Sequence, residues 1–260
     1  MPEGDTIWRT AARLRPALAG QTVIRFEAPR LVEKGPMPGT LIERVEARGK
    51  YLLIDFGDGT TLETHLVMTG SWHLYRVGER WRRSPGAARA VLEASSGWVA
   101  VCFSAPHVTL KRSGRARHLG PDLTSPAPDL DAAVKRFDRA IIGTSVGEVL
   151  LDQRICCGVG NVYKSEVLHA VGLAPTTRIE DLPLDVRRAL VETSHRLLRA
   201  NLDTGARRTV PEGLAVYGRA GKPCRRCGTA IVRIVQGEHA RSTYWCPGCQ
   251  LLPGVTRPDS

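Results

Sequence analysis

The chain has 260 residues, 42% of them hydrophobic, which is enough for one large domain or two ordinary domains with buried cores. Its 37 lysines and arginines outnumber its 26 acidic residues, and the net charge of +11 favours a polyanionic partner, nucleic acid before an anionic membrane. No apolar run is long enough for a membrane span, and no basic stub precedes an apolar segment. We therefore expect a cytoplasmic protein with no membrane partner.

The first expected element is a helix that begins near Asp5, which is placed to cap it, and that stops at Gly20. Apolar side chains recur along it at helical spacing, at Ile7, Ala11, Leu14 and Leu18. This pattern predicts an amphipathic helix with one face in a core.

The segment from Thr22 to Phe103 changes to short alternating runs that are separated by Gly, Pro and Asp turns. The runs are "TVIRFEA", "LIERVEAR", "YLLIDF", "TTLETHLVM", "SWHLY" and "WVAVCF". Together they predict a β-rich domain, a sandwich or a barrel, over residues 1–120.

The proline-containing stretch "GPDLTSPAPDLD" carries little apolar weight and predicts a linker over residues 121–131. Helical periodicity then returns and predicts a helical domain over residues 132–212. A short cysteine-paired segment at 216–251 predicts a separate small module, and we expect the tail at 252–260 to be disordered.

The cysteines of this module follow the spacing C-x2-C-x18-C-x2-C, which is typical of a structural zinc site with four thiolate ligands. The residues between the pairs suggest two strands joined by a turn, and an isolated hairpin is marginal in water without a metal. A redox dithiol pair is the alternative. The predicted ligands of one zinc ion are Cys224, Cys227, Cys246 and Cys249.

Three further features are ambiguous when each is taken alone. The glycine turn before Asn161 opens a helix, where backbone N–H groups can bind a phosphate, but it also suits a tight helix connection. Arg241 on the zinc hairpin could contact a phosphate or be an ordinary solvated arginine. Lys50 follows Gly49 in a β context, where a lysine is usually a solvated edge residue.

Taken together, these features make the sequence similar to the formamidopyrimidine-DNA glycosylase / endonuclease VIII family of base-excision repair enzymes. The match extends over nearly the whole chain, and its motifs occur in the order of the family. It is carried by Pro2-Glu3-Gly4, "RGK" at Arg48–Lys50, "GVGNVYKSE" at Gly158–Glu166 and "VYGRAGKPCRRCG…YWCPGCQ" at Val216–Gln250.

The resemblance implies an α+β multidomain fold. An N-terminal two-layered β-sandwich with flanking helices would precede a helical domain with a helix–two-turn–helix motif and a zinc β-hairpin. The implied partner is damaged double-stranded DNA, with single-stranded DNA as a second candidate, and the protein would act as a monomer.

The resemblance also implies roles for individual residues. Removal of Met1 would leave Pro2 as a secondary amine that attacks the sugar C1′ and forms a Schiff base, and elimination of the phosphates would follow. Glu3 would transfer protons at the sugar, and Lys50 would be a second proton donor and phosphate contact. Asn161 and Arg241 would hold phosphates around the lesion, and Arg241 matches the position assigned to δ-elimination.

One further resemblance and one departure concern the lesion. "THLVMTG" resembles the loop that fills the gap left by the flipped base, with Met68 as the plug and Val67 beside it, although a core methionine is the alternative. The purine-directed branch carries a Pro-Arg-Arg-Phe-Gly pattern that "APHVTLKRSGRARHLGPD" lacks; His118 there is a candidate DNA contact. We therefore expect the endonuclease VIII branch and a preference for oxidised pyrimidines.

Two other functions stay open at this stage. The first is a purine-directed glycosylase that acts on 8-oxoguanine and ring-opened purines. The second is a non-catalytic DNA-binding protein on the same scaffold, which is suggested only by Thr6, where the family usually has an acid. The joint presence of Pro2, Glu3, Lys50 and Arg241 argues against the second alternative.

Overall fold

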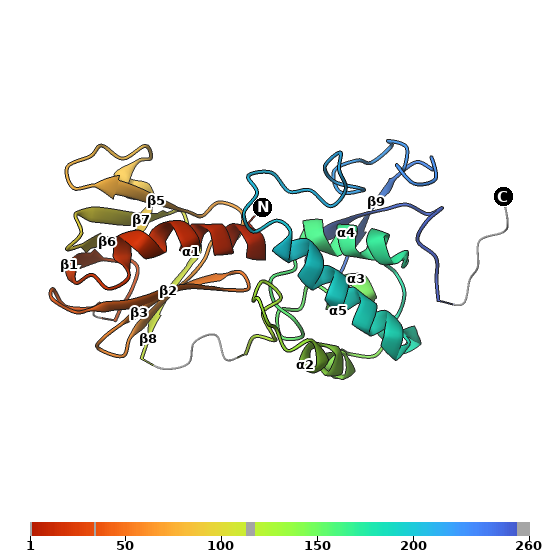
Figure 1. Ribbon diagram of the computed structural model, residues 1–260, viewed down its shortest axis with the longest axis horizontal. Helices are drawn as coiled ribbons and strands as arrows, with labels where there is room; N and C mark the ends of the chain where they lie inside the picture. The colour runs from red at the N-terminus through yellow and green to blue at the C-terminus, as the bar shows by residue number, and fades with distance from the viewer. Residues whose placement is uncertain (1, 34, 113–117, 254–260) are drawn as a thin grey trace. The chain divides into compact units, whose positions relative to one another are not determined.

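The computed structural model describes residues 2–33, 35–112 and 118–253 (Figure 1). The chain divides into two compact units, residues 1–117 and residues 118–260. None of the described helices is long and apolar enough to cross a membrane.

The first unit opens with helix α1 (Gly4–Leu18), as its apolar periodicity predicts. The predicted cap is wrong, because Glu3 rather than Asp5 is the N-cap residue and no side chain caps the helix. Asp5 already lies inside the first turn, where its carboxylate forms an ion pair of 3.2 Å with Arg9 one turn later. Asp5 is therefore two residues too late in the chain to receive the first backbone N–H groups.

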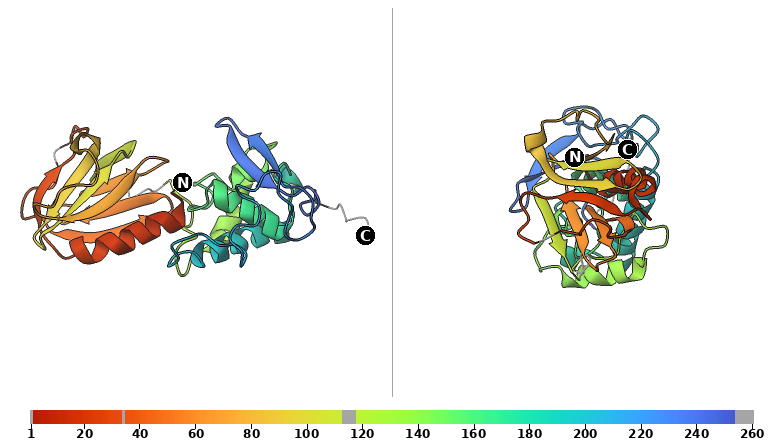
Figure 2. Two further views of the ribbon diagram at one scale, coloured as in Figure 1. Left: turned by 90° about the horizontal axis from the view of Figure 1, so that it is seen from above. Right: turned by 90° about the vertical axis from the view of Figure 1, so that its left-hand side faces the viewer.

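Two antiparallel four-stranded sheets follow the helix and form the predicted two-layered sandwich (Figure 2). One sheet has the order β1 (Val23–Glu27), β6 (Ala88–Ala94), β7 (Trp98–Phe103) and β5 (Ser71–Arg76). The other has the order β2 (Ile42–Arg48), β3 (Tyr51–Phe56), β4 (Thr61–His65) and β8 (His107–Lys111). A single 3-10 turn, η1 (Pro85–Ala87), precedes β6.

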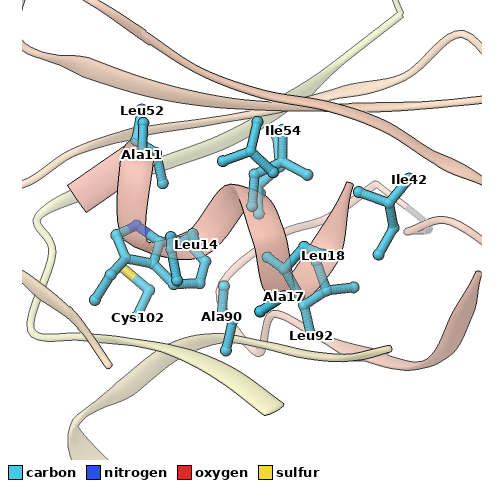
Figure 3. Packing of buried hydrophobic residues seen from close by; sticks show 14 of the residues in the cluster. Ala11, Leu14, Ala17, Leu18, Ile42, Leu52, Ile54, Ala90, Leu92 and Cys102 are labelled. Carbon is cyan, nitrogen blue, oxygen red and sulfur yellow. The ribbon is translucent and has the colours of Figure 1, made fainter. Parts of the chain in front are cut away.

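The core of this unit lies between the two sheets and against α1. Figure 3 shows Leu14 and Leu18 of the helix between Ile54 of one sheet and Leu92 and Cys102 of the other. All five side chains are fully buried. Burial of apolar area of this kind is the main stabilising contribution to the sandwich.

Two strands are absent from the sequence-based prediction, β6 and β8. Strand β6 is mostly buried on both faces and contains three alanines, so polar residues do not alternate clearly with apolar ones along it. Strand β8 lies at a sheet edge and is mostly solvent-accessible, with only Leu110 buried. Alternating hydrophobicity detects strands with one buried face, and neither of these two strands has that pattern.

The second unit is helical and ends in a hairpin. Its helices are α2 (Leu130–Lys135), η2 (Arg136–Arg139), α3 (Val146–Val149), α4 (Asn161–Val171), η3 (Ile179–Asp181) and α5 (Leu184–Arg199). Strand β9 (Val232–Gln236) pairs antiparallel with β10 (Arg241–Trp245) to form the hairpin. A separate apolar core of buried side chains from α2 to α5 holds the helices together.

The segment expected as a linker, residues 121–131, instead packs on the second unit. Leu123 is fully buried in the helical core, and its backbone N–H donates to the Cys157 carbonyl at 3.1 Å. The prolines in this stretch predict an irregular backbone, but such a backbone can still pack on a domain when one of its apolar side chains, here Leu123, is buried in the core. Of the expected disordered tail, residues 254–260 lie outside the described residues, as does Met1.

A buried carboxylate in α4 connects the helices to the segment that leads into the hairpin. Glu166 is 1% exposed, and its Oε1 accepts the backbone N–H groups of Val216 at 2.9 Å and Tyr217 at 2.8 Å. Its Oε2 accepts the N–H of Ala215 at 2.8 Å and the hydroxyl of Thr209. The two oxygens of Glu166 together accept three backbone N–H groups and one hydroxyl, so this side chain joins α4 to the segment that leads into the hairpin.

We therefore expect Glu166→Gln to lower the free energy of unfolding of the second unit by about 2–4 kcal/mol, since the amide NH₂ would face buried donors. Urea denaturation followed by circular dichroism measures the change. Glu192→Gln on the exposed face of α5 is the matched control and should change the free energy by less than about 0.5 kcal/mol. If the two substitutions changed the free energy of unfolding equally, the stabilising role of the Glu166 hydrogen bonds would be contradicted.

Candidate functional site

The N-terminus of the first unit places Pro2 and Glu3 directly before α1. Glu3 is fully buried, and its carbonyl accepts the backbone N–H groups of Thr6 at 2.9 Å and Ile7 at 3.1 Å. Pro2 is only partly buried. The helix therefore fixes the backbone of Glu3, and the imino acid before it remains accessible to solvent.

Lys50 lies in the tight turn between β2 and β3, which is closed by the pairing of Arg48 with Tyr51. Gly49 has a φ of 57° there, a left-handed conformation that glycine adopts without steric cost. The lysine is thus on a rigid turn between two paired strands, which differs from the solvated strand edge that is usual for such a residue.

The sequence pattern did not predict the histidine that lies next to Lys50. His65 ends β4, opposite Tyr51 on β3 and His107 on β8, and its ring centroid lies 4.9 Å from that of Tyr51. Burial, then the positive charge of Lys50, then His107 lower its pKa to about 4. The imidazole is therefore neutral at physiological pH. The only sequence signal for it was its position in "THLVMTG".

The loop that follows His65 presents Met68 to solvent. Met68 is 62% exposed, so it is not a core residue, and its neighbour Val67 has a φ of 50°, an unusual conformation for a β-branched residue. The loop is closed by a hydrogen bond of 2.8 Å from the Gly70 N–H to the Leu66 carbonyl. A Cβ at Gly70 would come within 2.7 Å of that oxygen, so the tight closure requires glycine.

In the second unit, Asn161 is the first residue of α4 and is 8% exposed. The preceding turn is held by the Gln153 side chain, which accepts the Gly158 N–H at 3.1 Å and donates to the Val159 carbonyl at 3.0 Å. Gly158 has a φ of 110°, which favours glycine at this point. The turn before the helix thus has a fixed conformation. An anion-binding site at this turn would need such a fixed backbone.

Arg241 is exposed at the start of β10, opposite Gln236 on β9. The Gln236 side chain anchors this end of the hairpin, because its amide donates to the Pro175 carbonyl at 3.0 Å and accepts the Thr243 hydroxyl at 2.6 Å. The next residue of β10, Ser242, accepts a hydrogen bond of 3.4 Å from the buried ammonium of Lys164 in α4. The strand that carries Arg241 is therefore fixed against the helix that begins at Asn161.

The sulfur atoms of Cys224, Cys227, Cys246 and Cys249 all lie within 4.8 Å of one another. Hydrogen bonding with Thr229, the largest cause, lowers the pKa of the Cys227 thiol to about 6, which favours the thiolate form that zinc binds. Four thiols in this arrangement fit one structural zinc ion, as the spacing predicts. Cys102, Cys156 and Cys157 are buried elsewhere.

The remaining candidate, His118, is exposed at the beginning of the second unit. Residues 113–117 before it, which belong to the stretch that lacks the purine-branch pattern, lie outside the described residues. The candidate residues are thus shared between the units. The first contains Pro2, Glu3, Lys50, Val67 and Met68, and the second contains His118, Asn161, Arg241 and the four cysteines.

Comparison with known protein families accounts for this arrangement of domains. Residues 1–107 match the formamidopyrimidine-DNA glycosylase N-terminal domain, residues 119–211 match the formamidopyrimidine-DNA glycosylase H2TH domain, and residues 221–251 match the zinc finger found in FPG and IleRS. The chain belongs to the formamidopyrimidine-DNA glycosylase / endonuclease VIII family.

Individual relatives agree with this assignment. The chain is 40% identical to the "Probable endonuclease 8 2" of Streptomyces coelicolor, over 97% of this chain and 95% of the relative. It is 36% identical to the "DNA-(apurinic or apyrimidinic site) lyase Nei2" of Mycolicibacterium smegmatis, over 96% and 99% of the two chains. The crystal structure of the MutM (Fpg) protein from Thermus thermophilus superposes with a TM-score of 0.77 at 29% identity, covering 96% and 98%.

The zinc centre predicts the effect of losing one ligand. Cys246→Ser should reduce the zinc content from one ion per chain to a small fraction and destabilise the β9–β10 hairpin, because two strands of this length are marginal alone. Elemental analysis of natively purified protein measures the metal. Cys102→Ala, in the core of the first unit, is the control and should leave the zinc content at one ion.

The proximity of Lys50 predicts a shift in the titration of His65. The pKa of His65 should be near 4 in the native protein and should rise in Lys50→Gln, since removal of the ammonium stabilises the imidazolium. Because the folded pKa is below the ordinary value of 6.5, stability from this group is present above pH 6.5 and is lost as the pH falls toward 4. NMR titration of the imidazole resonances measures both values, and an unchanged pKa in the variant would contradict the contact.

Proposed function

We propose that this chain excises oxidised pyrimidines from DNA and then cleaves the resulting abasic site by β,δ-elimination through a Schiff base on Pro2. Its family makes it a DNA glycosylase with abasic-site lyase activity in base excision repair, and the proposal concerns the substrate and the catalytic residues. The observation that carries it is the position of Pro2 and Glu3 before α1, with Glu3 buried and Pro2 accessible.

Pro2 suits the first step because removal of Met1 leaves a secondary amine whose ordinary pKa is about 8, so part of it is neutral at cellular pH. Its nitrogen attacks the sugar C1′ and the bond from C1′ to the base breaks, with a proton supplied to the departing base. The nitrogen proton is lost, O4′ takes up a proton as the C1′–O4′ bond breaks and the sugar ring opens, and a positively charged iminium results. This cation draws electrons from the neighbouring C2′–H bond, so that the proton is removed and the 3′-phosphate leaves.

The proton transfers at the sugar need groups held close to the nucleophile. Glu3 is covalently next to Pro2, and its buried position gives the carboxyl group a fixed location for proton transfer at the sugar ring. Lys50 is a second proton donor and phosphate contact. Because the low pKa of His65 keeps its imidazole neutral, His65 adds no positive charge beside the Lys50 ammonium.

The remaining site residues hold DNA. Asn161 and Arg241 contact phosphates around the lesion from α4 and β10, with Arg241 also promoting the second elimination, and His118 is a further contact. Met68, exposed at the tip of its loop with Val67 beside it, fills the gap left by the flipped base. The partner is damaged double-stranded DNA, with single-stranded DNA as a second substrate, and the chain acts as a monomer.

The preference for pyrimidines is supported by two observations. The segment after β8 lacks the Pro-Arg-Arg-Phe-Gly pattern of the purine-directed branch. In addition, the relatives at 36–40% identity are named as endonuclease 8 or Nei2 proteins, whereas a relative named formamidopyrimidine-DNA glycosylase, from Rhizorhabdus wittichii, is 34% identical over 96% of this chain.

The nucleophile can be identified by borohydride trapping on an abasic-site duplex followed by protease digestion and mass spectrometry. We expect the DNA remnant on the N-terminal peptide at Pro2. A form that retains Met1 buries the nitrogen in a peptide bond and should lose trapping by at least about 100-fold, by analogy with loss of a nucleophile, while binding DNA normally. A remnant on Lys50 or another lysine would refute the mechanism, and no adduct at all would indicate a non-catalytic DNA-binding protein.

The substrate preference is measured with a panel of lesions. Thymine glycol, dihydrouracil and 5-hydroxycytosine in duplex and single-stranded DNA should be excised at least about 10-fold faster than 8-oxoguanine opposite cytosine, a difference of about 1.4 kcal/mol in transition-state binding. Glu3→Gln should slow base release more than cleavage of a preformed abasic site, which serves as its internal control. Equal or faster excision of 8-oxoguanine would assign the chain to the purine-directed branch.

A further inference from the structure

A basic loop in the first unit has no role in the site described above. Residues 79–85, "ERWRRSP", follow β5 and end at the first residue of η1, and we call this segment the arginine loop. It surrounds a hollow of about 520 Å³ that is lined only by its own residues. Its three arginines are exposed, and no ion pair among the described residues involves any of them: Arg80, Arg82 and Arg83.

The backbone of the arginine loop is anchored on the outer face of a sheet. The Trp81 ring packs on Phe103 with centroids 5.7 Å apart and on Tyr75 at 6.2 Å. The Arg82 N–H donates to the Tyr75 hydroxyl oxygen at 3.1 Å, and that hydroxyl lies 3.2 Å from Nδ1 of His73. The arginines are therefore presented by a fixed segment, so that less conformational entropy is lost on binding.

Positive charge is concentrated around this anchor. Burial lowers the pKa of His73 first, and the charges of Arg83, Arg13 and Arg82 lower it further. Arg13 comes from α1, where it donates to the Trp72 carbonyl. The one carboxylate of the arginine loop, Glu79, accepts the Arg76 N–H at 2.9 Å and pairs with none of these arginines. An uncompensated cluster of arginines of this kind favours a polyanion.

The 3-10 turn η1, in which the arginine loop ends, is hydrogen-bonded through Ser104 to the loop that exposes Met68. The last residue of η1, Ala87, accepts the Ser104 N–H at 2.8 Å, and the Ser104 carbonyl accepts the Thr69 hydroxyl at 3.0 Å. Ser104 thus bridges the end of η1, two residues after the arginine loop, to the residue directly after Met68.

We propose that the arginine loop binds the sugar-phosphate backbone of the DNA strand next to the point where Met68 enters the duplex. The inference rests on the proposed function, because it takes Met68 as the residue that fills the gap. Trp81 is packed between the sheet and its own loop, so it serves as an anchor, and the contacts are made by guanidinium groups with phosphate oxygens. Such contacts add affinity without reading sequence.

The test compares two triple variants with the same loss of charge in the same unit. Arg80→Gln/Arg82→Gln/Arg83→Gln removes the cations of the loop, and Arg25→Gln/Arg30→Gln/Arg44→Gln removes three exposed arginines from the β1–β2 region. The probe is a duplex with a tetrahydrofuran abasic analogue, which the enzyme cannot cleave. Its dissociation constant is measured at several salt concentrations by fluorescence anisotropy.

We expect the arginine-loop variant to bind about 10- to 100-fold more weakly at moderate salt and to reduce the slope of log affinity against log salt by about 2–3. The β1–β2 variant should lose less than about 3-fold, as expected for a loss of long-range charge. Arg80→Gln alone, at an exposed position, should weaken binding several-fold and reduce the slope by about 1, and it guards against misfolding of the triple variant.

The outcomes separate the inference from the function on which it rests. If the native protein binds and is trapped on abasic DNA but both triple variants bind alike, the arginine loop has no DNA contact and the inference is wrong. The inference is also wrong if affinity falls without a change in salt slope. If the native protein gives no trapped adduct, the proposed function fails, whereas the arginine loop is still judged by the affinity and the salt slope of the two triple variants on uncleavable DNA.

Discussion

The hairpin of the second unit depends on a bound metal ion, because its two strands are not stable alone. Two strands of five residues bury too little apolar area to offset their conformational entropy. The four clustered thiolates provide the missing link at one end of the hairpin, and hydrogen bonds from Gln236 and Lys164 fix it to the helices. Arg241 has a defined position only because both attachments exist.

Charge placement distinguishes the two kinds of site in this molecule. Glu166 is a buried carboxylate surrounded by donors, so its charge is balanced locally and serves to join two segments. The arginines of the arginine loop have no acidic partner among the described ion pairs, and their charge remains directed at solvent. A balanced charge contributes to folding, whereas an unbalanced charge at an exposed anchored position suits a polyanionic ligand.

Expectations from the sequence succeeded where the signal was local and regular. The spacing of Ile7, Leu14 and Leu18 located α1, and the cysteine pairs identified the metal centre. They failed where the local rule was ambiguous: Asp5 is a good capping residue but lies inside the helix, and the proline-containing segment around Leu123 looks like a linker but packs into a core. Strand β6 was missed because burial of both its faces removes the alternation.

The sequence by itself determined the order of the motifs and the chemistry of their side chains. Residue type and spacing along one chain are enough to identify a set of four thiolate ligands or a proline before a glutamate at the N-terminus. Contacts between residues far apart in the chain were decided only by the tertiary structure. The strand register buries His65 beside Lys50, which lowers its pKa, and Ser104 joins the end of η1 to the Met68 loop. Such neighbours depend on which strands pair and in which register, and that choice is made by burial over the whole sheet.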